Sequence, residues 1–228
     1  MANVELWGAV LGSLFGSVLT TVFYYLLVYL YDRKRPLNLT RKGHWIVSKS
    51  FLFAGAIVFA GVFVYSFRCL MNLGQQMDPT DFILVFFLIP FLGLTAVTDY
   101  RTQIISNRVL LVMLGIWIVV MSLSLLYRID ETLYLLVSSL SAAALAGLAF
   151  LLCYFVTKRQ MGAGDVKLAA ILGLYLNGSR IVGGILFGLI ICLIYSVVQM
   201  IRRKMTLKSS LPLGPFLFLG SVLVIVLS

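Results

Sequence analysis

Long apolar segments separated by short polar loops make up almost the whole chain. Most of these segments approach the roughly 20 apolar residues with which an α-helix crosses a bilayer. They do not show the strict alternation of apolar and polar residues that is typical of membrane β-strands. The pattern therefore predicts an all-α, polytopic membrane protein with about eight transmembrane helices, at about 7–31, 51–73, 82–98, 109–126, 133–157, 165–176, 181–201 and 213–228.

The sixth segment is too short for a regular span. As a helix, residues 165–176 would rise only about 18 Å, whereas the hydrocarbon core of a bilayer is about 30 Å thick. Two glycines, Gly162 and Gly164, come directly before it. Irregular backbone at membrane depth is tolerated only where protein or a water-filled cavity surrounds it. We therefore expect either that this glycine turn is recessed in a wet cavity that faces the cytoplasm or that the bilayer thins there.

The composition supports a membrane protein without a separate soluble domain. Hydrophobic residues make up 61% of the chain and charged residues 11%, whereas a soluble domain is about half apolar and about one quarter charged. We expect residues 1–228 to form one integral-membrane domain. The three cysteines are far apart, no CxxC pair occurs, and His44 is the only histidine. This predicts no metal site and no cofactor.

The positive charge is concentrated in alternate loops. Fifteen of the 18 Lys and Arg residues lie in the loops at 32–50, 99–108, 157–167 and 201–210. Because basic residues accumulate on the cytoplasmic side of membrane proteins, the pattern places these loops inside and both termini outside. The net charge of +10 then reflects topology and contact with anionic membrane lipid. We expect no nucleic-acid partner.

Two aspartates end up on the predicted cytoplasmic side. Asp99 follows the third apolar segment and Asp165 opens the sixth. An ionisable residue in this position is a candidate for function, although an N-cap role for Asp165 is the structural alternative. Two carboxyl groups close together in a low dielectric share one proton. The ionised group can then activate a water while the protonated group polarises a carbonyl. The pair therefore suggests amide hydrolysis without a metal.

Several neighbouring residues are candidates for shaping this site. Gly162 and Gly164 have no Cβ, so their backbone can approach a ligand closely. Lys167 either extends to the membrane surface or tunes the charge of the site. The turn that enters the last apolar segment is either a simple membrane-entry turn or a rigid wall beside the site; it contains Pro212, Gly214 and Pro215.

These stretches resemble motifs of the type IV prepilin peptidase family, the GxGD aspartic proteases. The sequence MGAGDVKL, Met161–Leu168, is similar to the family's GxGD-x-K-L motif. Asp99 is followed by Ile105-Ser106-Asn107, close to the family's Ile-Pro-Asn, with Ser106 in place of proline. Leu211–Phe216 is similar to the family's Pro-Phe-Gly-Pro-Phe, and Gly16–Leu19 to its Gly-Ser-Phe-Leu. The motifs occur in the family's order along nearly the whole chain.

The resemblance implies a specific activity and site. It implies a membrane endopeptidase that removes the leader of a prepilin or pseudopilin precursor, as in type IV pili, type II secretion and competence. Asp99 and Asp165 would be its catalytic pair, and Asn107 would belong to the first motif. Many members also carry two CxxC pairs in the first loop, linked to N-methylation. The short basic loop at 32–50 has no cysteine, so N-methylation is not supported.

Three alternatives stay open at this point. The substrate of a GxGD peptidase could instead be an archaeal flagellin-like precursor. Asp99 and Asp165 could form the relay of a proton-coupled transporter, although no inverted repeat is detectable in the sequence. The chain could also be a structural helper without activity. The sequence does not name the particular substrate, the oligomeric state or the aspartate that holds the proton.

Overall fold

The computed structural model describes residues 2–34, 49–71, 79–157, 161–203 and 211–227. The described residues form eight helices and no strand: α1 (Ala2–Lys34), α2 (Lys49–Met71), α3 (Pro79–Thr102), α4 (Asn107–Tyr127), α5 (Ile129–Val156), α6 (Ala163–Leu176), α7 (Gly178–Ile201) and α8 (Gly214–Leu227). Each predicted segment corresponds to one helix, in order and with ends that agree within a few residues. Most of the predicted basic loop 32–50, namely residues 35–48, lies outside the described residues.

The helices confirm an all-α, multi-pass membrane protein. Six of them are long and apolar enough to cross a membrane: α1 to α5 and α7. Helices α6 and α8 have 14 residues each, which corresponds to a rise of about 21 Å. The short sixth helix was predicted. The equally short α8 begins one residue after the start of the predicted segment 213–228 and extends to Leu227, the last described residue.

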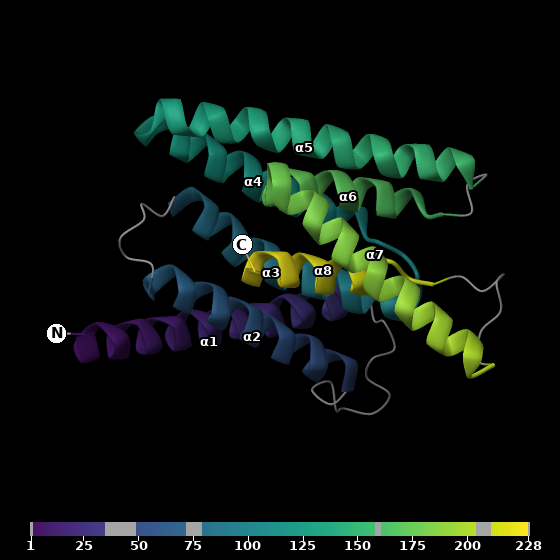
Figure 1. Ribbon diagram of the computed structural model, residues 1–228, viewed down its shortest axis with the longest axis horizontal. Helices are drawn as coiled ribbons and strands as arrows, with labels where there is room; N and C mark the ends of the chain where they lie inside the picture. Colours follow the sequence, from purple (N-terminus) through teal and green to yellow (C-terminus); the bar gives the residue numbers. More distant parts are fainter. Residues whose placement is uncertain (1, 35–48, 72–78, 158–160, 204–210, 228) are drawn as a thin grey trace.

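Helix α3 forms the centre of the bundle. It packs against α1, α2, α4, α6 and α8, and 72% of its membrane-spanning window is buried. Figure 1 shows α5 along one side of the bundle, α1 and α2 along the other, and α3 and α8 between them. The C-terminal ends of α1, α3, α5 and α7 all point to the right of this view. The residue that ends α3 therefore lies at the same end of the bundle as the start of α6.

Small residues allow several helix pairs to approach closely. A Cβ on Gly173 of α6 would lie 2.4 Å from the Cα of Ala143 in α5. A Cβ on Gly220 of α8 would lie 2.2 Å from the carbonyl oxygen of Gly184 in α7. Such contacts between backbones are typical of membrane helices, which pack through small residues. The stripes of small residues in these segments are therefore packing faces.

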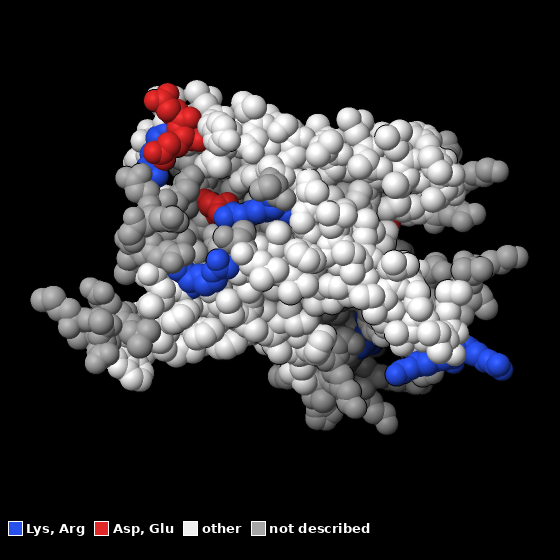
Figure 2. All heavy atoms as spheres, in the orientation of Figure 1, with Lys and Arg blue, Asp and Glu red and all other residues white. Residues whose placement is uncertain are grey.

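Charges gather at the two ends of the bundle. Figure 2 shows a long uncharged surface between a left-hand end with acidic and basic side chains and a right-hand end with basic ones. At the acidic end, Arg128 forms a salt bridge of 2.8 Å with Glu131. Arg68 donates a hydrogen bond there to the carbonyl oxygen of Val226 in the last turn of α8. This bond satisfies a helix-end carbonyl that has no partner within its own helix.

Candidate active site

The side chain of Asp99 is buried at the end of α3. It is 4% exposed, and its Oδ2 accepts a hydrogen bond of 2.8 Å from the backbone N–H of Gly214, the first residue of α8. A Cβ on Gly214 would lie 2.8 Å from the same oxygen, so only glycine allows this approach. The first N–H groups of a helix have no partner within it, and the N-terminal end favours a negative charge. The N-terminal end of α8 therefore contacts the Asp99 carboxyl group and stabilises its negative charge.

Asp165 is partly buried in the first turn of α6. Its backbone N–H donates a hydrogen bond of 3.1 Å to the carbonyl oxygen of Gly162. A Cβ on Gly162 would lie 3.1 Å from Asp165 Oδ2, so this glycine leaves space beside the carboxyl group. The carboxyl groups of Asp165 and Asp99 are close enough to interact electrostatically. The structure thus brings together the two aspartates that the sequence singled out.

The loop between α3 and α4 begins just after Asp99 and packs against the segment that carries Asp165. Helix α3 ends at a turn in which Gln103 has a positive φ of 52° and donates its N–H to the carbonyl oxygen of Asp99. The chain then passes over Gly164, whose Cβ would lie 2.9 Å from the Cβ of Ile105. The absence of a side chain at Gly164 therefore allows α6 to pack against this loop.

Two predicted site-shaping residues contact each other at the exposed edge of this site. Lys167 Nζ donates a hydrogen bond of 3.1 Å to Asn107 Oδ1. Both residues are exposed, so their contact joins α6 to α4 on the surface. Ser106, which replaces the proline of the family pattern, is buried at the N-cap of α4. No contact joins Lys167 to either aspartate among those the structure describes.

The turn before α8 contains the remaining predicted residues. The sequence predicted either a membrane-entry turn or a wall beside the site. In the structure, Gly214 contacts the Asp99 carboxyl group directly. Pro215 follows in the first turn of α8, where the lack of an N–H is tolerated. Pro215 also lines an apolar groove beside Asp99. Pro212 is partly buried two residues before Gly214.

A third membrane carboxylate has a different environment, which the sequence analysis missed. Asp81, in the first turn of α3, forms a salt bridge with Arg180 of α7, and its Oδ2 accepts a hydrogen bond of 3.4 Å from the hydroxyl group of Tyr65. The charge pattern along the chain does not pair Asp81 with Arg180. An acid at the start of the third apolar segment and a base at the start of the seventh were the available signal. Within the described ranges, no group of three or more His, Cys, Asp or Glu side chains could hold a metal ion.

Comparison with known proteins places this site within a family. Residues 86–197 match the model of the type IV leader peptidase family. The chain is also 27% identical, over 135 residues, to the prepilin leader peptidase/N-methyltransferase of Bacillus subtilis strain 168, covering 59% of this chain and 52% of the relative. The chain thus spans about half the length of this curated relative. No solved structure matches the chain.

The fold and the family match together indicate a multi-pass membrane protein that is similar to a peptidase family. The similarity to the type IV leader peptidase family extends over residues 86–197, just under half of the chain. The resemblance noted from the motifs is thereby confirmed, and the match supports the prediction that the protein is an enzyme. The matched segment includes Asp99 and Asp165, together with Asn107, Gly162, Gly164 and Lys167.

Proposed function

We propose that this protein is a membrane aspartic endopeptidase that removes the N-terminal leader of a prepilin or pseudopilin precursor. The observation that carries this proposal is the approach of Asp99 and Asp165 at one end of the bundle, within the segment that matches the leader peptidase family. We place the protein in the cytoplasmic membrane of a prokaryote, with both termini outside. The basic residues in the loops around the two aspartates support a site that faces the cytoplasm.

The two aspartates would divide the chemistry between them. One carboxylate takes a proton from a water molecule, and the water oxygen attacks the carbonyl carbon of the scissile peptide bond. The other, protonated carboxyl group donates a hydrogen bond to the carbonyl oxygen and polarises it. Collapse of the tetrahedral intermediate breaks the C–N bond, and the first aspartate passes the proton that it took from the water to the nitrogen of the leaving amine. Two carboxyl groups in one low-dielectric site favour this division, because both do not ionise readily.

The surroundings of the pair would keep this geometry fixed. The Gly214 N–H holds one oxygen of Asp99, which orients the carboxyl group toward a defined direction. The small space at Gly162 beside Asp165 Oδ2 leaves room for a water or a peptide backbone. Holding reacting groups in a fixed arrangement accounts for a large share of enzymatic rate enhancement.

The proposed substrate would lie partly in the lipid and partly in the cytoplasmic cavity. Its apolar segment lies laterally against the helices in the lipid, and its leader reaches the cytoplasmic cavity. The proposed activity is cleavage alone. The Bacillus relative is named for both cleavage and N-methylation, but the match covers about half of that protein. The loop at 32–50 contains no cysteine.

Cleavage in a reconstituted system tests this function. The protein is placed in lipid vesicles without an ion gradient and incubated with prepilin, pseudopilin and archaeal flagellin-like precursors. We expect wild-type protein to cut at least one of them at a single bond, as read by mass spectrometry, which also reports any added methyl group. Asp99→Asn and Asp165→Asn should insert and fold but not cleave.

Asp130→Asn is a matched control at the opposite end of the bundle, because Asp130 lies in the first turn of α5. It should cleave at the wild-type rate. Normal processing by either Asp99→Asn or Asp165→Asn would refute the catalytic pair. Ion movement that depends on both aspartates, without cleavage, would favour the transporter.

A further inference from the structure

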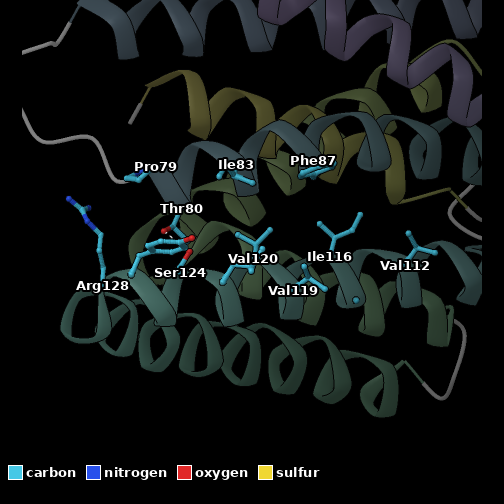
Figure 3. Close-up of a pocket in the computed structure, with 13 residues that line it drawn as sticks. Pro79, Thr80, Ile83, Phe87, Val112, Ile116, Val119, Val120, Ser124 and Arg128 are labelled. Carbon is cyan, nitrogen blue, oxygen red and sulfur yellow. Dashed lines mark hydrogen bonds between the residues drawn. The ribbon is translucent and has the colours of Figure 1, made fainter.

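A long apolar groove lies between α3 and α4. Its volume is about 870 Å³, within the range of about 300–1,000 Å³ that is typical of small-molecule sites. Figure 3 shows Ile83 and Phe87 of α3 facing Ile116 and Val120 of α4 across it. Gly115 also lines the groove, and a Cβ built on it would meet no atom within 4 Å. The missing side chain at this position therefore keeps the groove open.

The groove opens toward the lipid. On its α4 wall, the side chains of Val112, Val119 and Leu123 are each at least 50% exposed. Helix α4 is one of the helices that are long and apolar enough to cross a membrane. Exposed apolar side chains on such a helix face the hydrocarbon of the bilayer. The groove is thus accessible to the acyl chain of a lipid.

One end of the groove carries a pair of opposite charges. Arg128 lines this end (Figure 3) and forms a salt bridge of 2.8 Å with Glu131 in the first turn of α5. The two side chains are 40% and 55% exposed. A guanidinium group has five N–H donors and a carboxylate has two acceptor oxygens. Both groups can therefore bind a further partner while they stay close together.

Groups of intermediate polarity lie next to this charged pair. The hydroxyl groups of Thr80 and Ser124 are 2.9 Å apart and form a hydrogen bond across the groove (Figure 3). Tyr127 also lines the groove and is 86% exposed, and tyrosine is enriched at the interface between membrane and water. Charged groups, hydroxyl groups and hydrocarbon thus follow one another along the groove, as head group, glycerol and acyl chain do in a phospholipid.

We infer that this groove binds one phosphatidylethanolamine molecule, with an acyl chain between α3 and α4, the phosphate at Arg128 and the ammonium group at Glu131. Arginine binds phosphate through strong, charge-assisted hydrogen bonds, and a carboxylate accepts hydrogen bonds from an ammonium group. A choline head group has no N–H to donate. An anionic head group has no cation for Glu131, and the neighbouring Asp130 would repel it.

The dimensions of the groove favour an acyl chain over a helix. On α3 the lining extends from Pro79 to Phe87, a rise of about 12 Å, and on α4 it extends from Val112 to Tyr127, about 22 Å. These lengths bracket the roughly 15 Å depth of one leaflet, half of the hydrocarbon core. A helix about 10 Å across would occupy roughly 1,600 Å³ over 20 Å of its length, more than the 870 Å³ of the groove.

Native mass spectrometry of the full chain in detergent tests the inference by binding and not by cleavage. The protein is titrated with phosphatidylethanolamine, phosphatidylglycerol or phosphatidylcholine that carry the same acyl chains. We expect one phosphatidylethanolamine per protein, bound at least about tenfold more tightly than the other two lipids, because only this lipid pairs with both charged groups.

Two glycine variants test the apolar part of the site. Gly115→Leu fills the groove with a good helix-forming residue and should weaken phosphatidylethanolamine binding about tenfold or more. Gly8→Leu is the matched control, because a Cβ on Gly8 of α1 also meets no atom within 4 Å. It should bind the lipid as wild-type protein does.

Two arginine variants test the head-group contact. Arg128→Gln should lower the affinity for phosphatidylethanolamine about tenfold, since it removes the charge-assisted hydrogen bonds. Its thermal unfolding midpoint should stay close to that of wild-type protein, because exposed salt bridges contribute little to stability. Arg202→Gln, at the exposed C-cap of α7, is the matched control and should keep the wild-type affinity.

Several results would overturn the inference. These are wild-type affinity in either Gly115→Leu or Arg128→Gln, equal binding of the three lipids, and equal losses in the control variants. Protein dimers or complexes with a precursor that disappear in Gly115→Leu, in place of lipid complexes, would assign the groove to a helix instead. None of these results bears on the proposed cleavage, which the precursor assay tests separately.

Discussion

The two ends of helix α3 each carry an aspartate, and their environments differ. Asp81 in the first turn forms a salt bridge with Arg180 and accepts a hydrogen bond from Tyr65. Asp99 in the last turn accepts an N–H from Gly214 and lies within electrostatic range of a second carboxyl group, that of Asp165. Among the described residues Asp99 forms no salt bridge. One helix thus carries Asp81, which is paired with a positive charge, and Asp99, which is not. The two residues are about 27 Å apart along the helix axis.

Under the proposed function, this difference would separate a structural carboxylate, Asp81, from a catalytic one, Asp99. The Asp81–Arg180 pair joins α3 to α7, and Tyr65 adds α2 to the same contact. A charge that is paired in this way holds helices together. A carboxyl group that faces another carboxyl group can exchange a proton instead. The comparison predicts that mutations at the Asp99 end reduce catalysis, whereas mutations at the Asp81 end reduce stability.

The largest expected effect is on catalysis at the Asp99 end. Asp99→Asn should lower kcat/KM for a precursor by about 10³-fold or more, because the group can no longer accept or donate the catalytic proton. Its thermal unfolding midpoint should change little, since the amide oxygen of Asn can still accept the Gly214 N–H. Cleavage and unfolding are measured in one detergent, with Asp81→Asn alongside. An equal loss of activity per folded molecule in Asp81→Asn would contradict the comparison.

A smaller effect is expected on stability at the Asp81 end. Arg180→Leu leaves the Asp81 carboxylate unpaired and should lower the free energy of unfolding by about 3 kcal/mol, the low end for buried pairs. The low end applies because the Arg180 and Asp81 side chains are 29% and 16% exposed. Cleavage per folded molecule should persist at low temperature.

The double variant Arg180→Leu/Asp81→Leu serves as the control for that loss. It removes both charges and should recover most of the stability. A double variant no more stable than Arg180→Leu alone would show that packing, and not the unpaired charge, causes the loss.

A third prediction concerns the contact between α8 and Asp99. In Gly214→Ala the new Cβ would lie 2.8 Å from Asp99 Oδ2, so the carboxyl group or α8 must shift. We expect kcat to fall about 10- to 100-fold, since small displacements of reacting groups are costly, with a smaller change in KM. Gly8→Ala is the matched control, because a Cβ there meets nothing within 4 Å. Equal activity in both variants would show that the N–H contact is not needed.

The smallest expected effect is at the exposed edge of the site. The hydrogen bond of Lys167 to Asn107 is exposed, and such contacts contribute little. Lys167→Ala should therefore change kcat/KM only about twofold, with the same change in Asn107→Ala and no further change in the double variant. A tenfold loss in Lys167→Ala that Asn107→Ala does not share would instead indicate that Lys167 tunes the charge of the aspartates.

The helices could be predicted because long apolar runs and polar loops follow directly from the bilayer. Charge counting also placed Asp99 and Asp165 on the same side, and the structure brings them together. The short length of the sixth helix could also be predicted, because glycines come directly before Asp165 and mark where the segment begins. In these cases the sequence pattern follows from what the bilayer requires of each segment by itself, namely its apolar length and the charge of its flanking loops.

Contacts between distant segments could not be predicted in the same way. The turn before the last helix was interpreted as either a membrane-entry turn or a wall beside the site, whereas Gly214 donates its N–H directly to Asp99, 115 residues earlier. The pairing of Asp81 with Arg180 joins residues 99 positions apart. The groove beside Asp99 is formed by residues of three helices, among them alanines whose pattern resembles ordinary packing. Such features arise only from the mutual placement of helices.

The short helices α6 and α8 couple this protein to the thickness of its membrane. Both pack against α3, and each rises about 21 Å in a hydrocarbon layer of about 30 Å. A bilayer accommodates such hydrophobic mismatch by thinning, at a fraction of a kcal/mol for each Å. The lipid around the two aspartates is therefore expected to be compressed, which brings water to buried carboxyl groups without a pore. Longer lipid chains would oppose this compression, so we expect the proposed cleavage to slow as the acyl chains of the host membrane lengthen.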